Sequence, residues 1–539
     1  MIQRSTRSGR SLDTHLSLRF GLLVVLLFVA LLANAQAQNA TDTRLKEIDE
    51  YAQKAGQDWR VPGFALAIVK DDKVIFAKGY GVRRLGEAAP VDEHTIFAIA
   101  SNSKAFTAAT LGTLVDEGKI SWDDPATKHL PGFQLHDPYV TRELTIRDLL
   151  SHRSGLATFG GDLLWYEASY DRKEIMRRIR FLKPTSSFRS RFGYQNILFL
   201  AAGEIVPSVT GKSWDDYVRE RFFTPLGMRR TVTSISAFKN MDNIAAPHNE
   251  LDGKLRVVRY SNVDAAGGAA NINSSVADMA QWIRLLLGRG KYEGKQLFSP
   301  SVSREMWTPH TILPIGEQAE KFNPTRHFNT YGLGFFLSDY HGRKVASHGG
   351  GLDGMISNVA LMPEENLGLV VLTNSETSLS SILVSKVFDT FLGVAKRDWS
   401  AEQLEQRTKG QEAARAAEKK IEDSRTPNTK PSLALQDYAG TYGGEMYGDA
   451  RVTEENGKLV VRLLPSPNFV GDLEHWHFDT FRIKWREGVS YPFGRGFVTF
   501  VLDPQGKPAE MKLDVPNPDF DFKELEFKRR KQTAAASGK

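Results

Sequence analysis

The 539-residue chain contains no cysteine, and this absence removes several kinds of chemistry at once. Disulfides, thiol nucleophiles, thiolate metal ligands and lipid-modified cysteines are all excluded. The chain also lacks G-x-S-x-G, the nucleophile turn of α/β-hydrolases, and H-E-x-x-H, which is typical of zinc hydrolases. We therefore expect no catalytic metal and no other cofactor.

Strong charge of one sign is also missing. The formal net charge is +6 with histidine neutral, and the first 37 residues, with four arginines against one aspartate, account for +3 of it. The remaining +3 is small for a chain of this length, so the composition gives no indication of nucleic-acid binding.

Long apolar runs are scarce as well. The longest covers residues 20–32, follows a basic stretch and precedes small residues at positions 33–37. Thirteen residues are few for a bilayer, which needs about 20, and the flanks are those of a cleaved signal peptide. We expect residues 1–37 to be a signal peptide and the mature protein to be periplasmic or secreted, without stable membrane insertion. A membrane anchor is the alternative.

The rest of the chain divides by texture into an α+β part and an all-β part. Apolar runs at residues 64–77 and 359–373 predict strand-turn-strand units at the two ends of a segment that is helical between them, so one sheet should unite both ends. We expect a hydrolase domain over 38–397, a charged helical linker over 398–432, a small barrel-like domain over 433–530, and a disordered tail over 531–539.

The first candidate site is Ser101-Asn102-Ser103-Lys104, which matches S-x-x-K. At positions i and i+3 of a helix, Ser101 and Lys104 share one face, where a neutral lysine could take the serine proton. The pattern alone is weak, because it recurs at residues 236–239. Ser101 differs from that second match because it follows apolar residues and should begin an amphipathic helix that ends before Gly118.

Two further elements carry groups that such a serine would need. Tyr194-Gln195-Asn196 offers a phenolate for proton exchange and an amide for hydrogen bonding, although residues 260–262 match the same Y-x-N pattern. His348-Gly349-Gly350-Gly351 precedes a predicted strand, and its glycines permit close approach of backbone to substrate. In isolation each element is more typical of packing or of a turn.

In this order the three elements resemble the penicillin-recognising serine hydrolases, which include class C β-lactamases, D,D-peptidases, D-aminopeptidases and β-lactamase-type carboxylesterases. The resemblance extends over about residues 45–393 and includes Trp122-Asp123-Asp124-Pro125, Leu149-Leu150-Ser151-His152-Arg153-Ser154-Gly155-Leu156, Asp264-Ala265-Ala266-Gly267-Gly268, Tyr331-Gly332-Leu333-Gly334 and Val371-Leu372-Thr373-Asn374. It implies the β-lactamase/transpeptidase-like fold, an antiparallel sheet with a helical subdomain. The C-terminal region resembles the lipocalin-like domains of some peptidases in this group.

The resemblance also implies the roles of individual residues. Ser101 would be the acylated nucleophile, Lys104 its base partner and Tyr194 the second proton carrier, with Asn196 beside them. The backbone N–H groups of Ser101 and Gly351 would form the oxyanion hole, next to His348 and Gly350. We interpret His152 as a packing or hydrogen-bonding residue, and a Ser-His-Asp triad is the rival mechanism.

One departure from the family pattern bears on the substrate. Classical β-lactamases and D,D-peptidases carry Lys-Thr-Gly where this chain has His348-Gly349-Gly350, and a neutral histidine offers no fixed charge to a substrate carboxylate. We therefore predict a peptidase or amidase that acts on small amide or peptide substrates, with peptides that contain D-residues as candidates. A carboxylesterase or weak β-lactamase is the alternative, and a non-catalytic peptidoglycan-binding scaffold is a third hypothesis. The barrel should control access or assembly, and a homo-oligomer is possible.

Overall fold

The computed structural model describes residues 1–2 and 41–531, apart from 252, 487–490 and 492. Residues 3–37 of the expected signal peptide and 532–539 of the expected tail lie outside the described residues. Among the described residues, no helix is both long enough and apolar enough to traverse a bilayer.

An eight-stranded antiparallel sheet forms the frame of the first domain, in the order β2-β1-β14-β13-β12-β11-β10-β9. The early hairpin and the late hairpin meet near one edge of this sheet, where β1 pairs with β14 in register Ala67 to Val370. The expectation that one sheet unites both ends is therefore confirmed. The strands are β1 Gly63–Lys70, β2 Lys73–Gly81, β9 Thr311–Ile312, β10 Asn329–Tyr331, β11 Phe336–Tyr340, β12 Arg343–Leu352, β13 Met355–Met362 and β14 Leu367–Thr373.

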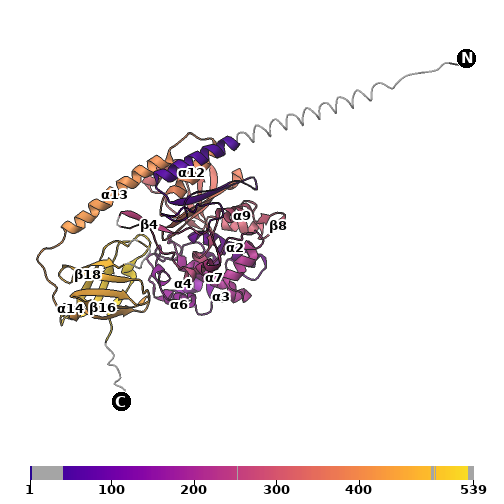
Figure 1. The fold of residues 1–539 in the computed structure, drawn as a ribbon. Helices are drawn as coiled ribbons and strands as arrows, with labels where there is room; N and C mark the ends of the chain where they lie inside the picture. Colours follow the sequence, from indigo (N-terminus) through magenta and orange to yellow (C-terminus); the bar gives the residue numbers. More distant parts are fainter. Residues whose placement is uncertain (3–40, 252, 487–490, 492, 532–539) are drawn as a thin grey trace.

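Strands β1 and β14 are buried on both faces, and successive residues of β1 alternate between two apolar cores. Phe64, Leu66 and Ile68 pack with residues 41–58, which are helical, and with the helix α12 (Leu379–Leu392). Ala65, Ala67 and Val69 face the main core, which also includes α9 (Val276–Leu287). Figure 1 shows the N-terminal helix and α12 together at the outer side of the sheet.

The helical subdomain fills the chain between the two hairpins. Its central helix is α2 (Ser103–Asp116), in which residues 103–114 are all buried. The amphipathic pattern predicted for this helix is thus wrong: the segment is enclosed on every side, so it shows no polar face. The other helices are α3 Ala126–His129, α4 Pro138–Glu143, α5 Ile146–Leu149, α6 Arg172–Arg178, α7 Asn196–Thr210, α8 Trp214–Val218, α10 Pro300–Met306 and α11 Glu317–Phe322.

A long charged helix leads to the second domain. α13 (Trp399–Asp423) runs along the outside of the molecule from α12 to the barrel (Figure 1). The barrel is closed, with eight antiparallel strands in chain order, which confirms the predicted β texture. These are β15 Gly440–Gly444, β16 Gly448–Glu455, β17 Lys458–Leu463, β18 Val470–His477, β19 Thr480–Trp485, β20 Gly496–Leu502, β21 Pro508–Asp514 and β22 Phe527–Arg529, preceded by α14 Leu435–Tyr438.

Candidate active site

Ser101 lies in a strained turn at the start of the buried helix. It belongs to the 3₁₀ turn η1 (Ala100–Asn102), directly before α2. Ala100 has φ = 45°, a left-handed conformation that costs a residue with a side chain about 1–3 kcal/mol and is found where a site must be held in place. Asn102 Nδ2 donates to Ser357 Oγ at 2.8 Å, and Ser357 Oγ donates to Ile99 O at 2.7 Å. These bonds fix the turn against β13.

The glycines after His348 bring strand β12 against this turn. A Cβ on Gly350 would lie 2.2 Å from Ile99 O and 3.0 Å from Ser101 N, so no side chain fits there. Gly349 and Gly351, on the opposite face of β12, line the cavity that contains Ser101. The structure thus places Gly350 beside Ser101 and Gly351 on the wall of the same cavity.

Lys104 is fully buried one turn after Ser101. Its Nζ lies 3.0 Å from Ser101 Oγ, 2.6 Å from Asn196 Oδ1 and 3.0 Å from Ala269 O. Burial lowers the pKa of Lys104 to about 7, against the opposing effect of the nearby Asp162 carboxylate. The displacement from 10.5 corresponds to about 5 kcal/mol against the charged form, so a neutral amine is accessible near pH 7.

Asp162 is a member of the site that no sequence motif indicated. It lies at the start of the 3₁₀ turn η2 (Asp162–Leu164), where its carboxylate accepts from Asn196 Nδ2 at 2.6 Å and from Trp165 Nε1 at 2.9 Å. Because the carboxylate accepts from the amide nitrogen, the amide oxygen of Asn196 must point toward Lys104. Burial raises the pKa of Asp162 to about 7.

Tyr194 stands just before α7 and covers Lys104. Lys104 Nζ lies 4.7 Å from the centre of the Tyr194 ring, and Tyr194 lines the same cavity as Ser101. Burial raises the pKa of Tyr194 above its usual value, an effect that the neighbouring Ser101 side chain only partly offsets. The phenol is therefore neutral, which favours a proton donor over the phenolate considered from the sequence.

His348 is buried at the cavity wall and is held as a neutral ring. Its Nδ1 lies 2.6 Å from Gly349 O, a partner that can only accept, so Nδ1 carries the proton. Its Nε2 lies 3.0 Å from the Tyr331 hydroxyl and accepts from it. Burial, together with the Lys104 charge, lowers the pKa of His348 to about 3. No fixed positive charge is present at this position.

The cavity in front of Ser101 has a volume of about 490 Å³ and is closed on one side by the barrel domain. Tyr491, Asp519 and Phe520 of the second domain line it, opposite Ser101 and His348 of the first. Four carboxylates reach the surface of the cavity: Asp162, Asp353, Glu376 and Asp519. No lysine or arginine is among the described residues that line it.

The second matches to the motifs lie away from this cavity. Ser236 and Lys239 are exposed in a 3₁₀ segment, and Ser236 accepts from its neighbour Ser234 at 2.8 Å. Tyr260 donates to Asn273 Oδ1 at 2.8 Å and is not among the residues that line the cavity. Ser101 and Lys104, from the first S-x-x-K match, therefore lie together with Tyr194 and Asn196, from the first Y-x-N match.

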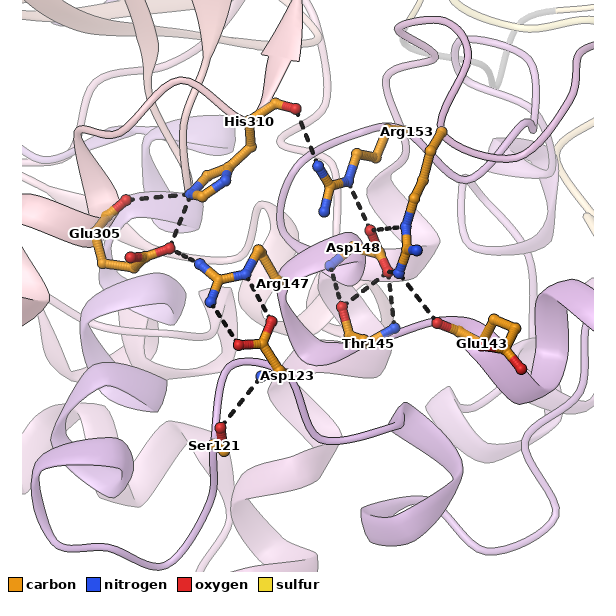
Figure 2. A network of polar contacts seen from close by, with 10 residues as sticks. Ser121, Asp123, Glu143, Thr145, Arg147, Asp148, Arg153, Glu305 and His310 are labelled. Atoms are coloured by element: carbon orange, nitrogen blue, oxygen red, sulfur yellow. Dashed lines mark hydrogen bonds and ion pairs between the residues drawn. The ribbon is translucent and has the colours of Figure 1, made fainter.

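A polar network surrounds the buried Asp148, close in the chain to residue 152 (Figure 2). The buried Asp148 accepts from Arg153 Nε and from Arg189 Nη2, both at 2.6 Å, and caps α5 together with Thr145. Arg153 also donates to His310 O at 3.1 Å. The network thereby fixes the backbone on both sides of residue 152.

His152 has an architectural place beside this network. Its φ is 56°, its Nδ1 accepts from the Gln195 N–H at 2.9 Å, and its ring centre lies 4.1 Å from that of Tyr194. Burial lowers its pKa well below the usual value, so the ring is neutral. This geometry agrees with a packing and hydrogen-bonding role, in which His152 positions the segment carrying Tyr194 and Asn196.

A family model described as "Beta-lactamase" matches residues 48–383, which is the greater part of the chain and includes every first-domain residue of the candidate site. The chain belongs to the β-lactamase family. A second model, for a domain of unknown function, DUF3471, matches residues 424–529 of this β-lactamase-family protein and so covers its barrel.

Curated relatives include hydrolases. Unguisins hydrolase ungD' of Aspergillus campestris is 30% identical over 437 residues, covering 77% of this chain and 78% of the relative. Protein flp of Staphylococcus aureus is 28% identical over 341 residues, covering 62% of this chain and 64% of the relative.

Solved structures give the same fold. The octameric penicillin-binding protein homologue of Pyrococcus abyssi covers 90% of this chain and 99% of its own, with a TM-score of 0.59 and 20% identity. A D-stereospecific amidohydrolase from Streptomyces sp. covers 64% of this chain and 99% of its own, with a TM-score of 0.50 and 25% identity. The predicted fold and family are confirmed, and the chain has the fold of a β-lactamase-type hydrolase.

Proposed function

We propose that this protein is an exported serine amidohydrolase that cleaves amide or peptide bonds through an acyl-enzyme on Ser101. The observation that carries the proposal is the surroundings of Lys104 Nζ, which has two fixed acceptors and one hydroxyl around it. A neutral amine has two hydrogens, and Asn196 Oδ1 and Ala269 O take both. Its lone pair is then left for the Ser101 hydroxyl, which is the arrangement of a general base.

The remaining groups complete an acyl-transfer mechanism. Lys104 takes the Ser101 proton while Oγ attacks the substrate carbonyl carbon, and the N–H groups of Ser101 and Gly351 stabilise the oxyanion. As the C–N bond breaks, the neutral Tyr194 hydroxyl gives its proton to the leaving amine and regains one from the Lys104 ammonium. Water then attacks the acyl-enzyme, with the proton transfers reversed.

The cavity's charge favours substrates without a carboxylate near His348. A neutral His348 cannot pair with a substrate carboxylate, and Asp353, Glu376 and Asp519 would repel one. Burial raises the pKa of all three carboxyls, and the charges of Asp353 and Asp519 contribute at Glu376. A substrate ammonium would supply the missing cation, so peptides or amino-acid amides with a free amino group fit this end of the cavity.

Configuration and bond type rest on relatives. The Streptomyces neighbour is named a D-stereospecific amidohydrolase and the Aspergillus relative an unguisins hydrolase, which supports amide over ester substrates. A carboxylesterase or weak β-lactamase of the same mechanism is the second candidate, favoured by a solved neighbour, EstCE1, described as a hydrolase with acyltransferase activity. The third hypothesis, a non-catalytic scaffold, leaves the buried neutral lysine without a use.

A substrate panel tests the proposal. Purified protein is assayed with D- and L-aminoacyl p-nitroanilides, their N-acetyl derivatives, p-nitrophenyl esters and a chromogenic cephalosporin. The proposal expects the free-amine D-anilides to give the highest kcat/KM, with Ser101→Ala inactive on all. Cephalosporin turnover equal to or above that of the anilides would overturn the substrate assignment. Export is tested separately, by fractionation and N-terminal sequencing of the mature protein.

A further inference from the structure

One carboxyl group of the barrel domain contacts the backbone next to Asp162. Glu524 belongs to the 3₁₀ turn η8 (Phe522–Glu524), which links β21 to β22. Both of its carboxyl oxygens accept from the backbone N–H of Gly161 in the first domain, at 2.9 and 3.0 Å. Gly161 has φ = 81°, and a Cβ there would lie 2.7 Å from Ile197 Cδ1. The N–H that Glu524 accepts from thus belongs to a backbone segment that packs closely against α7.

Gly161 directly precedes the residue that orients the Lys104 partner. Asp162 follows it in the chain, Asp162 accepts from Asn196 Nδ2 at 2.6 Å, and Asn196 Oδ1 lies 2.6 Å from Lys104 Nζ. One peptide unit and two hydrogen bonds therefore connect the Glu524 contact to the lysine amine. A displacement of the Gly161–Asp162 peptide would turn the Asn196 amide and with it the hydrogens of Lys104.

Other barrel contacts hold the same segment. Phe520 packs on Tyr166 with ring centres 4.4 Å apart, Asn468 Nδ2 donates to Glu167 Oε2 at 2.6 Å, and Ser169 N donates to Pro465 O at 2.8 Å. Within the described part of the chain, no lysine or arginine forms an ion pair with Glu524, and burial raises its pKa to about 8. The carboxyl is therefore mostly neutral at pH 7 and meets the Gly161 N–H as a hydrogen-bond acceptor.

We propose that the barrel is a positioning element of the active site, in which Glu524 holds the Gly161 N–H and thereby sets Asp162, Asn196 and Lys104 for proton transfer. The inference rests on the proposed role of Lys104. In it, the DUF3471 domain helps to position the catalytic groups but supplies no residue that makes or breaks a bond. Glu524 is a positioning residue, because it touches neither substrate nor nucleophile.

The test compares three full-length variants: Glu524→Ala, Glu524→Gln and the matched control Glu526→Ala. Glu526 lies two residues away and also crosses to the first domain, through an exposed pair with Lys183 at 2.8 Å. Readouts are the rate of fluorophosphonate labelling at Ser101, kcat and KM on a small ester, and hydrogen exchange of the peptide covering residues 157–166.

We expect Glu524→Ala to lower kcat and the labelling rate roughly 10- to 100-fold, the scale of a misplaced catalytic group, with KM nearly unchanged. Glu524→Gln should restore most of the rate, because its amide oxygen still accepts from Gly161, and Glu526→Ala should behave as wild type. Hydrogen exchange over 157–166 should rise in Glu524→Ala alone.

Two results would overturn the inference: wild-type labelling and exchange in a folded Glu524→Ala, or an equal loss in Glu526→Ala, which would indicate a general interface effect. If Glu524→Ala does not fold, Glu524→Gln decides, and a loss as large as 10-fold in that variant contradicts the role of the acceptor. If wild type itself fails to label at Ser101, the proposed function fails, whereas the exchange measurement still tests the contact between the domains.

Discussion

Lys104 Nζ lies closer to Asn196 Oδ1, at 2.6 Å, than to Ser101 Oγ, at 3.0 Å. The lysine is thus anchored by the amide and presented to the serine, and the amide is itself oriented by Asp162. The position of the Lys104 amine therefore depends on three segments that are far apart in the sequence, those that carry Lys104, Asp162 and Asn196.

Removing the lysine amine should remove the base. Lys104→Ala is expected to lose about 10² to 10⁴ in kcat/KM, the usual contribution of a positioned acid–base group. Lys239→Ala, in the exposed second S-x-x-K match, is the matched control and should retain full activity. Because burial lowers the pKa of Lys104 to about 7, kcat/KM should rise with pH through about 7 and level off above it. Loss of only a few-fold, or a rate that falls as pH rises through 7, contradicts this role.

Neutralising Asp162 should change the pH at which kcat/KM rises. The Asp162 charge raises the pKa of Lys104, so Asp162→Asn should shift this rise in kcat/KM to lower pH. The plateau rate should also fall, because the replacement amide holds Asn196 less firmly than a carboxylate does. The pH profile of kcat/KM measures both effects. A rise that stays in place or moves to higher pH would show that Asp162 and Lys104 are not electrically coupled.

Replacing the neutral ring at the cavity wall should change substrate preference. His348→Lys places a cation where classical members of the family have one, so the ratio of kcat/KM for carboxylate-bearing over carboxylate-free substrates should rise. His348→Asn, which is also neutral, serves as the control and should leave the ratio unchanged. Efficient penicillin turnover by the unaltered protein would contradict the argument from charge.

The barrel carboxylate at the cavity should matter only for substrates with an ammonium group. Asp519→Asn is expected to raise KM for free-amine aminoacyl anilides about 10-fold, within the range of a hydrogen bond to a charged group, and to leave the N-acetyl derivatives unaffected. Asp514→Asn, whose carboxylate pairs with Lys523 at 3.2 Å, is a matched control on the same domain. An equal effect on both substrate classes would assign Asp519 a general structural role.

The sequence predicted those parts of the site that carry local patterns. Ser101 and Lys104 are three residues apart, and Tyr194 and Asn196 are two apart, so each pair could be recognised as a motif. Asp162 could not, because it meets Asn196 only through folding, 34 positions along the chain. The barrel residues that line the cavity were missed for the same reason, since their position depends on how two domains dock.

The strands of the first domain could be predicted from their apolar runs, whereas the burial of the enclosed helix α2 could not. β1 and β14 were found from their apolar runs, and their pairing followed from the hairpin at each end. The α2 helix was placed correctly, although its amphipathic pattern was wrong because neighbours cover it on every side. A sequence pattern reports contrast between faces, and a fully buried helix has none.

The most direct test of the account is active-site labelling with a fluorophosphonate, followed by identification of the modified peptide by mass spectrometry. The account predicts one adduct, on Ser101, with labelling abolished in Ser101→Ala and slowed in Lys104→Ala. An adduct on Ser236 or another serine, or equal labelling of Ser101→Ala, would contradict it.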